Sequence, residues 1–414
     1  MAAWKRNLYV LWFGNFFCMA GYSMIVPFIA LYVQELGIHD AKQAALWSSM
    51  IFGVTHVTGA IVSPFWGKLS DKYGKKVMMV RSGIGLCIVV VGMGFVNTPL
   101  QLLLMRALFG TVGGFGPASV ALIATETPKE EVGTALGTLQ TGTVTGSLLG
   151  PLLGGLVAEL VGMRNSFFVT GLFLFIATIL TIVFVKEKTV YEKFRFRRSS
   201  APEKPKAGLE KKPVLGDIVR QLPVILVLFV STFLIAASFQ SISPVISLYV
   251  KQMNIENHVE LMAGIIYASS ALGTVIAAPF LGRLGDKHGH MLVLLVSLLL
   301  LSILYIPQAM ITNAWLLMGV RFLSGLCVGG LTPSISSLLR RLTPSSIQGS
   351  VFSYNSSANS LGNVTGSLFG GIVAGSFGIS VVFYIIAGVF FLHFLMLLPQ
   401  YAKIGKAAKA ADNF

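Results

Sequence analysis

Long apolar segments recur along the whole chain and are separated by short polar segments. About twelve of them reach roughly 20 residues, the length that a helix needs to cross about 30 Å of hydrocarbon. The pattern predicts an all-α membrane protein with twelve transmembrane helices. The expected spans are 7–33, 44–66, 77–97, 99–124, 132–161, 164–186, 221–250, 260–281, 291–309, 313–340, 347–376 and 379–399.

One polar segment is much longer than the others. It is rich in Lys, Arg, Glu, Pro and Ser, which predicts a solvated cytoplasmic linker. This linker, taken as 187–220, separates an N-terminal six-helix bundle at 1–186 from a C-terminal six-helix bundle at 221–400. Residues 401–414 are expected to form a cytoplasmic tail.

The two halves repeat each other in sequence. Residues 64–74 align with 279–289 at an offset of about 215, and Arg106 aligns with Arg321 at the same offset. Two further pairs follow in the same order: 27–33 with 244–250, and 146–150 with 366–370. The repeat predicts two pseudo-symmetric bundles that enter the membrane the same way round. This is the arrangement of major facilitator transporters.

The composition supports a membrane protein. Hydrophobic residues make up 54% of the chain and charged residues 11%, whereas a soluble domain carries about a quarter charged residues. The net charge of +15 is unevenly distributed. One side of the predicted membrane receives Lys5, Arg6, Lys68, Lys72, Lys75, Lys76, Arg81, Lys129, the linker, Arg283, Lys287, Arg340, Arg341 and the tail lysines; the other receives Lys42, Arg164 and Lys251.

Because basic residues concentrate in cytoplasmic loops, this distribution places both termini inside. We expect a multi-pass protein of the bacterial cytoplasmic membrane, with the lipid bilayer as its surroundings. The basicity is then a signal of topology, and no nucleic-acid partner is expected.

The segment 67–76, G-K-L-S-D-K-Y-G-K-K, is predicted to be a loop between the second and third helices. Its glycines permit a tight turn, and Asp71 could cap a helix or pair with Lys75, Lys76 or Arg81. An ordinary basic loop is the alternative, but the recurrence at 282–289 argues against it. The spacing resembles the signature loop of the major facilitator superfamily. That resemblance implies a cytoplasmic latch formed by Gly67, Asp71, Gly74, Lys75 and Lys76, with Glu126 as a partner in its charge network.

Arg106 lies within the fourth span, where an arginine is costly and usually faces the protein interior or a wet cavity. With the glycines that follow it, Arg106 resembles the superfamily's helix-4 arginine motif, which implies a role in proton coupling. The alternative is a structural arginine that reaches toward the outer surface. Its recurrence as Arg321 fits a structural role at both places.

The fifth span carries Gly142, Gly146, Gly150 and Gly154 at four-residue spacing, together with Pro151 and Gly155. Such a stripe allows close helix packing, and the proline bends the span. Packing alone is one interpretation. The motif G-x-x-x-G-P-x-x-G-G also resembles the one that marks drug:proton antiporters within the superfamily, which implies efflux.

No G-x-x-x-x-G-K-[ST] motif is present, so ATP hydrolysis by this chain is not expected. No cofactor and no metal site are expected either, because the three cysteines form no ligand pattern. A proton gradient is the usual alternative energy source, yet no Asp or Glu lies near the centre of a span. The candidates for proton coupling are Arg106, Glu126, Asp71, Glu35 and His56, and His56 could equally be a structural histidine.

Several interior polar residues are candidates for lining a substrate cavity: Asn15, Tyr22, Gln140, Gln240, Asn355 and Asn359. Asn355, Asn359 and Asn363 are four residues apart and share one helix face. They could line a cavity or bond across helices. The segments 4–8, 63–67, 133–138, 352–355 and 362–365 resemble those of multidrug efflux proteins. Those proteins carry a charged pair between the last two of these segments, whereas 356–360 is uncharged here.

These features together predict a secondary active transporter, not an enzyme. We expect proton-coupled efflux of amphipathic, drug-like compounds by alternating access, with small molecules and protons as partners, the monomer as the working form and antibiotic resistance as the outcome. A carrier for a sugar or another metabolite remains an alternative, because the fold alone does not fix the substrate. A non-transporting sensor or scaffold would need a sizeable soluble domain, for which the linker is too short and polar.

Overall fold

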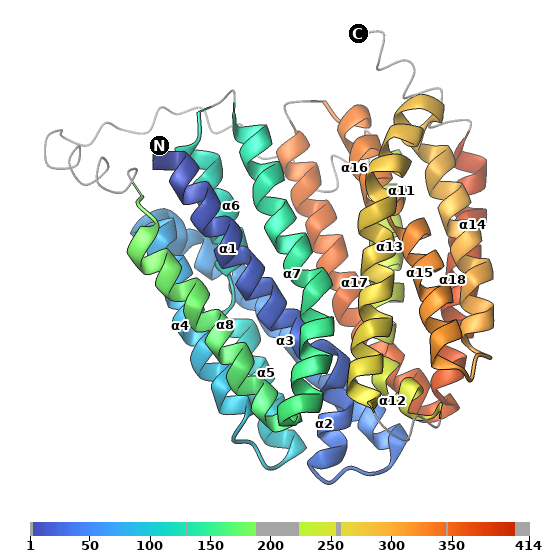
Figure 1. The fold of residues 1–414 in the computed structure, drawn as a ribbon. Coiled ribbons are helices and arrows are strands. Elements are labelled where there is room, and N and C mark those ends of the chain that lie inside the picture. The colour runs from blue at the N-terminus through green and yellow to red at the C-terminus, as the bar shows by residue number, and fades with distance from the viewer. Residues whose placement is uncertain (1–2, 129–130, 188–222, 254–257, 345–346, 402–414) are drawn as a thin grey trace, which may run out of the picture. The chain divides into compact units, whose positions relative to one another are not determined.

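The structure is a computed structural model that describes residues 3–128, 131–187, 223–253, 258–344 and 347–401 (Figure 1). Every regular element in these residues is a helix, as predicted. Nearly all of the predicted linker and tail lies outside the described residues. The N-terminal half forms α1 (Ala3–Met24), η1 (Val26–Phe28), α2 (Ile29–Glu35), α3 (Ala41–Tyr73), α4 (Lys75–Met93), α5 (Pro99–Val112), α6 (Phe115–Glu126), α7 (Val132–Val161) and α8 (Met163–Phe184).

The C-terminal half repeats the same succession of long and broken helices. It forms α11 (Pro223–Ile242), α12 (Ile246–Lys251), α13 (Val259–His288), α14 (His290–Gln308), α15 (Ala314–Val328), α16 (Leu331–Leu342), α17 (Gln348–Phe377), α18 (Ile379–Leu397) and η2 (Leu398–Gln400).

The chain divides into two compact units. Unit 1 comprises Met1–Tyr32 and Val54–Gly208, and unit 2 comprises Val33–Gly53 and Leu209–Phe414. The boundary passes through α3, so the first part of this helix belongs to unit 2 although it lies in the N-terminal half.

Both halves interrupt their first helix at a proline. Pro27 lies in η1 between α1 and α2, and Pro244 lies between α11 and α12. Proline has no N–H to donate and clashes with the preceding turn, so a helix bends or ends there. The sequence repeat therefore extends to the places where the backbone breaks.

A second break, at a pair of glycines, also recurs in both halves. Gly113 and Gly114 separate α5 from α6, and Gly329 and Gly330 separate α15 from α16. Gly114 has φ 125°, a conformation that residues with a Cβ rarely adopt. The fourth span of each half is thus two short helices instead of the single helix that the sequence predicted.

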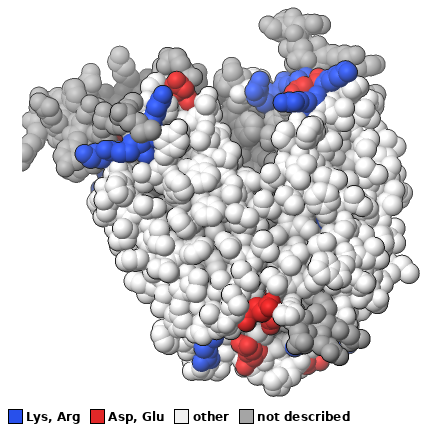
Figure 2. Space-filling view, in the orientation of Figure 1, with Lys and Arg blue, Asp and Glu red and all other residues white. Residues whose placement is uncertain are grey.

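The outer surface is apolar enough to face lipid. Eleven helical segments in the described residues are long and apolar enough to cross a membrane. Large hydrophobic side chains project from them with little cover, among them Ile61, Ile88, Phe95 and Leu160 at 71%, 67%, 68% and 73% exposure. In the face shown in Figure 2, Lys, Arg, Asp and Glu side chains gather at the two ends of the helices and leave an uncharged band between them. The chain is a multi-pass membrane protein.

α17 differs from the other long helices. It has 30 residues, yet it is too polar to be counted among the eleven apolar segments. Its sequence holds Ser, Asn and Gly in place of the Leu, Ile and Phe of its neighbours, and it has no charged residue. A helix of this composition is stable inside a membrane only if protein or water covers its polar face.

Candidate functional site

The segment 67–76 is not a loop along its whole length, which corrects the sequence prediction. α3 continues through Tyr73, and only Gly74, at φ 101°, makes the turn into α4. Gly67 therefore lies inside a helix, where nothing would obstruct a Cβ within 4 Å. The second copy behaves in the same way, with α13 running to His288 and Gly289 turning at φ 99°.

Glu187 caps the helix that follows this turn. Its two carboxylate oxygens accept hydrogen bonds from the backbone N–H groups of Lys75 and Lys76, at 3.0 and 2.9 Å. The first N–H groups of a helix have no partner within the helix, and its dipole favours a negative charge there. Glu187 thus takes the capping role that the sequence analysis considered for Asp71.

The segment that carries Glu187 is held from a second side by α1. Asn7 donates from Nδ2 to the Lys186 carbonyl at 2.7 Å and accepts from the Lys186 N–H at 3.1 Å. The Lys76 Nζ also donates to the Ile182 carbonyl at 2.8 Å. Asn7 and Glu187 therefore fix the end of the first six helices to the turn at Gly74. Sequence reasoning missed both residues, because neither lies in a motif and the contacts join positions more than 100 residues apart.

Replacing Glu187 with glutamine should destabilise the protein modestly, because the amide offers one neutral acceptor oxygen where the carboxylate offers two charged ones, so one N–H loses its partner. We expect a loss of about 1 kcal/mol, or about 2–4 °C in Tm. Thermal unfolding in detergent measures this effect. Glu131→Gln is the matched control, since Glu131 precedes α7 without a side-chain capping bond. An equal shift in both variants would show that the Glu187 cap adds nothing.

Arg81 does not pair with Asp71; it braces the glycine break instead. Its Nη2 donates to the Gly113 carbonyl at 3.0 Å, and its guanidinium lies 3.5 Å from the centre of the Trp66 ring. The Trp66 Nε1 donates to the Thr111 carbonyl at 2.6 Å. A cation over an aromatic face is attracted by the ring. Trp66 and Arg81 therefore tie the α3 end of the signature segment to the end of α5.

The two acidic latch candidates lie at helix ends. Asp71 is exposed near the end of α3 and has no ion pair within the described part of the chain, and Glu126 is the last residue of α6. Glu35, a proton-coupling candidate, is exposed at the end of α2. Their predicted roles stay predictions.

Arg106 is buried in unit 1, with 1% of its surface exposed. Its guanidinium lies 5.6 Å from the centre of the Phe109 ring, and that ring lies 5.7 Å from the ring of Tyr22. The arginine thus faces the protein interior and contacts neither lipid nor the outer surface. This position argues against an arginine that reaches outward.

His56 lies next to the same part of α5. The hydroxyl of its neighbour Thr55 donates to the backbone carbonyl of Arg106 at 3.2 Å. The Nε2 atom of His56 is buried and has no hydrogen-bond partner among the described residues. An unsatisfied buried nitrogen is uncommon, and a role in chemistry is one of its recognised explanations. Of the proton-coupling candidates, only Arg106 and His56 lie away from helix ends.

The second half contains an equivalent buried arginine. Arg321 is 8% exposed, and its guanidinium lies 5.7 Å from the centre of the Phe383 ring. Both units therefore hold one arginine inside the bundle, against an aromatic ring. Because Arg106 and Arg321 have similar surroundings, we expect both to have the same structural role in their bundles.

The glycine stripe of α7 is a packing surface for α1. A Cβ built on Gly142 would lie 2.6 Å from the Trp12 carbonyl, and one on Gly146 would lie 2.5 Å from the Phe16 carbonyl. Gly150 and Gly154 lie as close to the backbone of α1. Figure 1 shows α1 and α7 running alongside each other. The stripe places two backbones in direct contact, as small residues at fixed spacing allow.

α17 packs on α11 in the same way. Cβ atoms on Gly362, Gly366 and Gly370 would overlap the carbonyls of α11, the first at 2.5 Å from the Phe233 oxygen. The glycine contact is therefore common to both halves, whereas the inserted Pro151 occurs in α7 alone. The glycines of the antiporter-like motif thus belong to the shared architecture, and the proline is the part that distinguishes the halves.

One stripe of α17 carries uncharged polar side chains on an open surface. This α17 polar arc comprises Ser356, Asn359, Ser360 and Asn363, at the i, i+3, i+4, i+7 spacing of one helix face. Ser356, Asn359 and Ser360 are exposed, and the Asn363 Nδ2 donates to the Asn359 Oδ1 at 3.0 Å. Farther along the helix the same stripe is covered by α3, where Gly371 contacts Ser49. The arc is open over the first part of α17 only.

The remaining cavity candidates differ in position. Asn15 is buried and donates to Ser119 at 2.9 Å, so it joins α1 to α6 and does not face a cavity. Asn355 accepts from the Thr232 hydroxyl at 2.7 Å and so bonds across to α11. Two further candidates reach the surface at least partly: Gln140 is exposed and Gln240 is half-buried. The asparagines therefore divide between the two predicted roles: Asn355 bonds across to a neighbouring helix, whereas Asn359 lies on an open surface where it could line a cavity.

Among the described residues, no group of three His, Cys, Asp or Glu side chains could hold a metal ion.

Repeated helical units, with buried arginines and a polar arc on a membrane-embedded helix, define a multi-pass transporter. A family model described as Major Facilitator Superfamily matches residues 11–265 and 228–412. The chain belongs to the major facilitator superfamily. The predicted fold, two pseudo-symmetric six-helix bundles, is thereby confirmed, and the chain is a transporter and not an enzyme.

Relatives named as multidrug resistance proteins align over nearly the whole chain. Multidrug resistance protein MdtG of Proteus mirabilis (strain HI4320) is 41% identical over 396 residues, covering 95% of this chain and 95% of the relative. MdtG of Salmonella schwarzengrund (strain CVM19633) is 40% identical over 388 residues, covering 93% of each. The resemblance to multidrug efflux proteins that the sequence indicated is confirmed.

Solved structures show the same fold at low sequence identity. The nucleoside transporter NupG superposes with a TM-score of 0.76 at 13% identity, covering 97% of this chain and 99% of NupG. A bacterial homologue of the human lysosomal transporter Spinster gives 0.73 at 14% identity, covering 99% of this chain and 98% of the homologue. These likenesses concern the fold alone.

Proposed function

We propose that this protein exports amphipathic, drug-like compounds in exchange for protons. The observation that carries the proposal is 41% identity, over 95% of the chain, to a protein named for multidrug resistance. The α7 motif, whose Pro151 has no counterpart in α17, supports the antiporter direction. The protein works as a monomer by alternating access.

The proposed membrane orientation follows from the distribution of charge. Lys and Arg side chains concentrate at the end of each unit where α1 begins and where α16 ends, as Figure 2 shows for one face. Basic loops stay in the cytoplasm. Both termini are therefore cytoplasmic, and the bacterial cytoplasmic membrane is the location.

Inside-out membrane vesicles test the proposal. An imposed proton gradient, acidic inside, should drive accumulation of a neutral or weakly basic fluorescent drug, and collapsing the gradient should release it. Vesicles that lack the protein are the control. The proposal would be contradicted if none of a panel of drugs accumulated in response to the gradient. Uptake of a sugar or nucleoside in the same vesicles would then identify a metabolite carrier.

His56 and Arg106 are the proposed centre of proton coupling, because they alone among the candidates lie inside the bundle away from helix ends. His56→Gln keeps a side chain with hydrogen-bonding capacity but cannot gain charge. Active accumulation should fall about tenfold or more, a change of at least about 1.4 kcal/mol, while downhill exchange of drug persists. Retained accumulation with unchanged pH dependence would exclude His56 from coupling.

The α17 polar arc is the proposed substrate surface of unit 2. It offers amide and hydroxyl groups and no charge, so it suits compounds recognised through hydrogen bonds. Asn359→Asp adds a carboxylate there, which should raise transport of a permanently cationic dye relative to a neutral drug by about threefold or more, given the strength of charge pairs in a low dielectric. Asn165→Asp, on an exposed residue at the start of α8, is the matched control. Equal cation preference in the two variants would remove the arc from the substrate path.

A further inference from the structure

The second copy of the signature segment departs from the first at two positions in contact with each other. Gly285 stands where the first copy has Ser70, and His290 stands where it has Lys75. The positions that define the motif agree: Gly67 with Gly282, Asp71 with Asp286, and Gly74 with Gly289. The permanent positive charge after the turn in the first copy is thus a titratable group in the second.

The two departures are one structural change. The His290 ring lies directly on the backbone of Gly285, so that a Cβ there would overlap its Nδ1 atom. Only 4% of the His290 side chain is exposed. The His290 ring can be buried here only because residue 285 has no Cβ. A serine at 285 would occupy the space that the ring fills.

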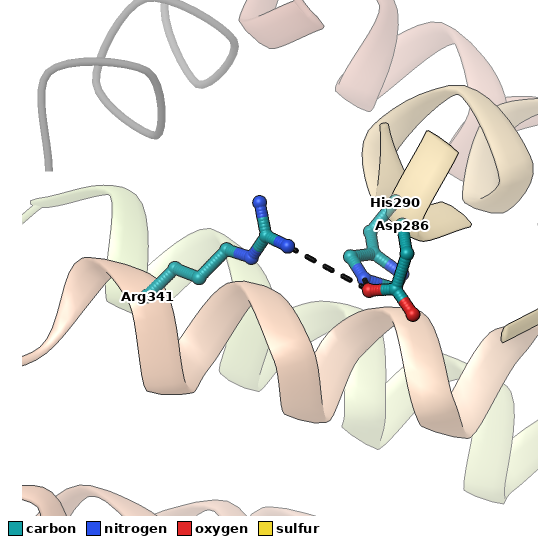
Figure 3. Close-up of polar contacts among 3 residues, drawn as sticks. All are labelled: Asp286, His290 and Arg341. Atoms are coloured by element: carbon teal, nitrogen blue, oxygen red, sulfur yellow. Dashed lines mark hydrogen bonds and ion pairs between the residues drawn. The ribbon is translucent and has the colours of Figure 1, made fainter. Parts of the chain in front are cut away.

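His290 and Arg341 converge on the same carboxylate oxygen. The His290 Nε2 lies 3.1 Å from the Asp286 Oδ1, and the Arg341 Nη2 lies 3.6 Å from that atom. Figure 3 shows the ring of His290 directly beside the Asp286 carboxylate and the Arg341 guanidinium reaching toward it from α16. The Asp286 side chain is 67% exposed and so has access to solvent.

We propose that His290 and Asp286 form a proton-binding site that is filled from the cytoplasm and that adjusts transport to cytoplasmic pH. Histidine is the residue type whose charge normally changes between pH 5 and 8. A protonated ring makes a charge-assisted bond to the carboxylate, stronger than the bond of the neutral ring. Protonation therefore neutralises Asp286 locally and weakens its attraction for Arg341.

The buried side of the His290 ring makes the neutral and the protonated forms of the site differ in structure. The His290 Nδ1 has no hydrogen-bond partner in the described part of the protein. In the neutral ring this atom needs no donor of its own, but in the protonated ring it becomes a buried N–H that must find an acceptor or water. Filling the site thus changes how the ring sits on Gly285, and with it the turn between α13 and α14.

Asp286 is the carboxylate that interacts directly with the His290 ring. The helices packed against α14 are α13, α15, α16 and α18. Besides Asp286 and Arg341, their charged residues and histidines are Glu260 at the far end of α13, Arg283, Lys287 and His288 on its exposed end, Arg321, Arg340, and the buried His393, which bonds to Ser231. Their remaining titratable side chains are Tyr267, Cys327 and Tyr384. Of the two carboxylates, Asp286 is the one that lies within hydrogen-bonding distance of the His290 ring.

Histidine NMR on the full-length protein in detergent tests the site without any transport assay. The ring signals of His290, assigned by their loss in His290→Lys, should shift as the ring gains a proton on acidification. Asp286→Asn should move the midpoint of this change to lower pH, since the carboxylate that attracts the charged ring is lost. Arg341→Met should move it to higher pH. His288→Lys, an exposed histidine two residues away, should leave it unchanged; a His290 signal that does not titrate, or that ignores Asp286→Asn, overturns the proposal.

The link to transport rests on the proposed function and is measured separately. The double variant Gly285→Ser with His290→Lys rebuilds the first copy's residues, and it should show a flatter dependence of drug export on cytoplasmic-side pH between 6 and 8 than the wild type. His288→Lys should keep the wild-type profile. If drug export depends on pH in the same way in the wild type and the double variant, His290 does not regulate transport, although the protein is still an exporter. Loss of drug export in the wild type itself would instead refute the proposed function, and the NMR titration would still decide whether the proton site exists.

Discussion

Replacing Gly150 with leucine should abolish drug export and most of the folded protein. A Cβ at this position already overlaps Ser23 and lies 2.7 Å from the Ala20 carbonyl, so a leucine side chain has no space between α7 and α1. Overpacking costs about 1–3 kcal/mol where side chains can move aside, and here one of the two obstacles is backbone. We therefore expect a cost above about 3 kcal/mol, seen as loss of the monodisperse peak in detergent chromatography and of vesicle transport.

The same helix provides the control. Gly137 is also in α7, and nothing lies within 4 Å of a Cβ built there. Gly137→Leu should keep expression and export near wild type. If Gly150→Leu is as well folded and active as Gly137→Leu, the close contact between α1 and α7 is not required. Gly370→Leu should reproduce the Gly150 result, because Gly370 meets the backbone of α11.

Arg106→Met should separate stability from transport. The guanidinium is almost fully buried, and an apolar side chain of similar length avoids the cost of holding a charge away from water. If Arg106 serves proton coupling, export should fall at least about a hundredfold, a change of about 2.7 kcal/mol or more, while Tm is unchanged or higher. Vesicle export and thermal unfolding of the same preparation measure the two effects.

Arg321→Met is the control that separates a coupling role of Arg106 from a structural one. Arg321 occupies the equivalent place in unit 2 and also lies near an aromatic ring. A purely structural contribution would make the two variants alike in both measurements. A much larger loss of export for Arg106→Met would assign the coupling role to unit 1, and a parallel loss of stability and export in both would contradict it.

The repeat, the number of spans and the family could be predicted from the sequence, because each depends on patterns along the chain. The alignment of 64–74 with 279–289 marks the ends of α3 and α13, and apolar length marks the spans. The end of α3 was predicted wrongly. The glycine at 67 suggests a loop, but a glycine inside a helix costs only about 1 kcal/mol, and the neighbouring residues continue the helix.

The contacts around the turn could not be predicted in the same way. Glu187 and Asn7 act on residues far away in the chain, and their residue types are common in polar segments. Arg81 was considered as a partner for Asp71 because the two are close in sequence, yet it stacks on Trp66 and braces Gly113. Separation along the chain does not reveal which side of a helix bundle a long side chain reaches.

The composition of α17 has a consequence for how the protein is made. A segment inserts into the bilayer by itself only when its apolar residues outweigh its polar ones, and α17 falls below that balance while the helices on either side of it in the chain do not. Its glycine face is satisfied by α11 and its later turns by α3, both synthesised long before it. α17 must therefore enter the membrane against helices that are already in place. Biogenesis of the second bundle is then a cooperative late step, and a destabilised α11 should leave α17 exposed to proteases outside the bilayer.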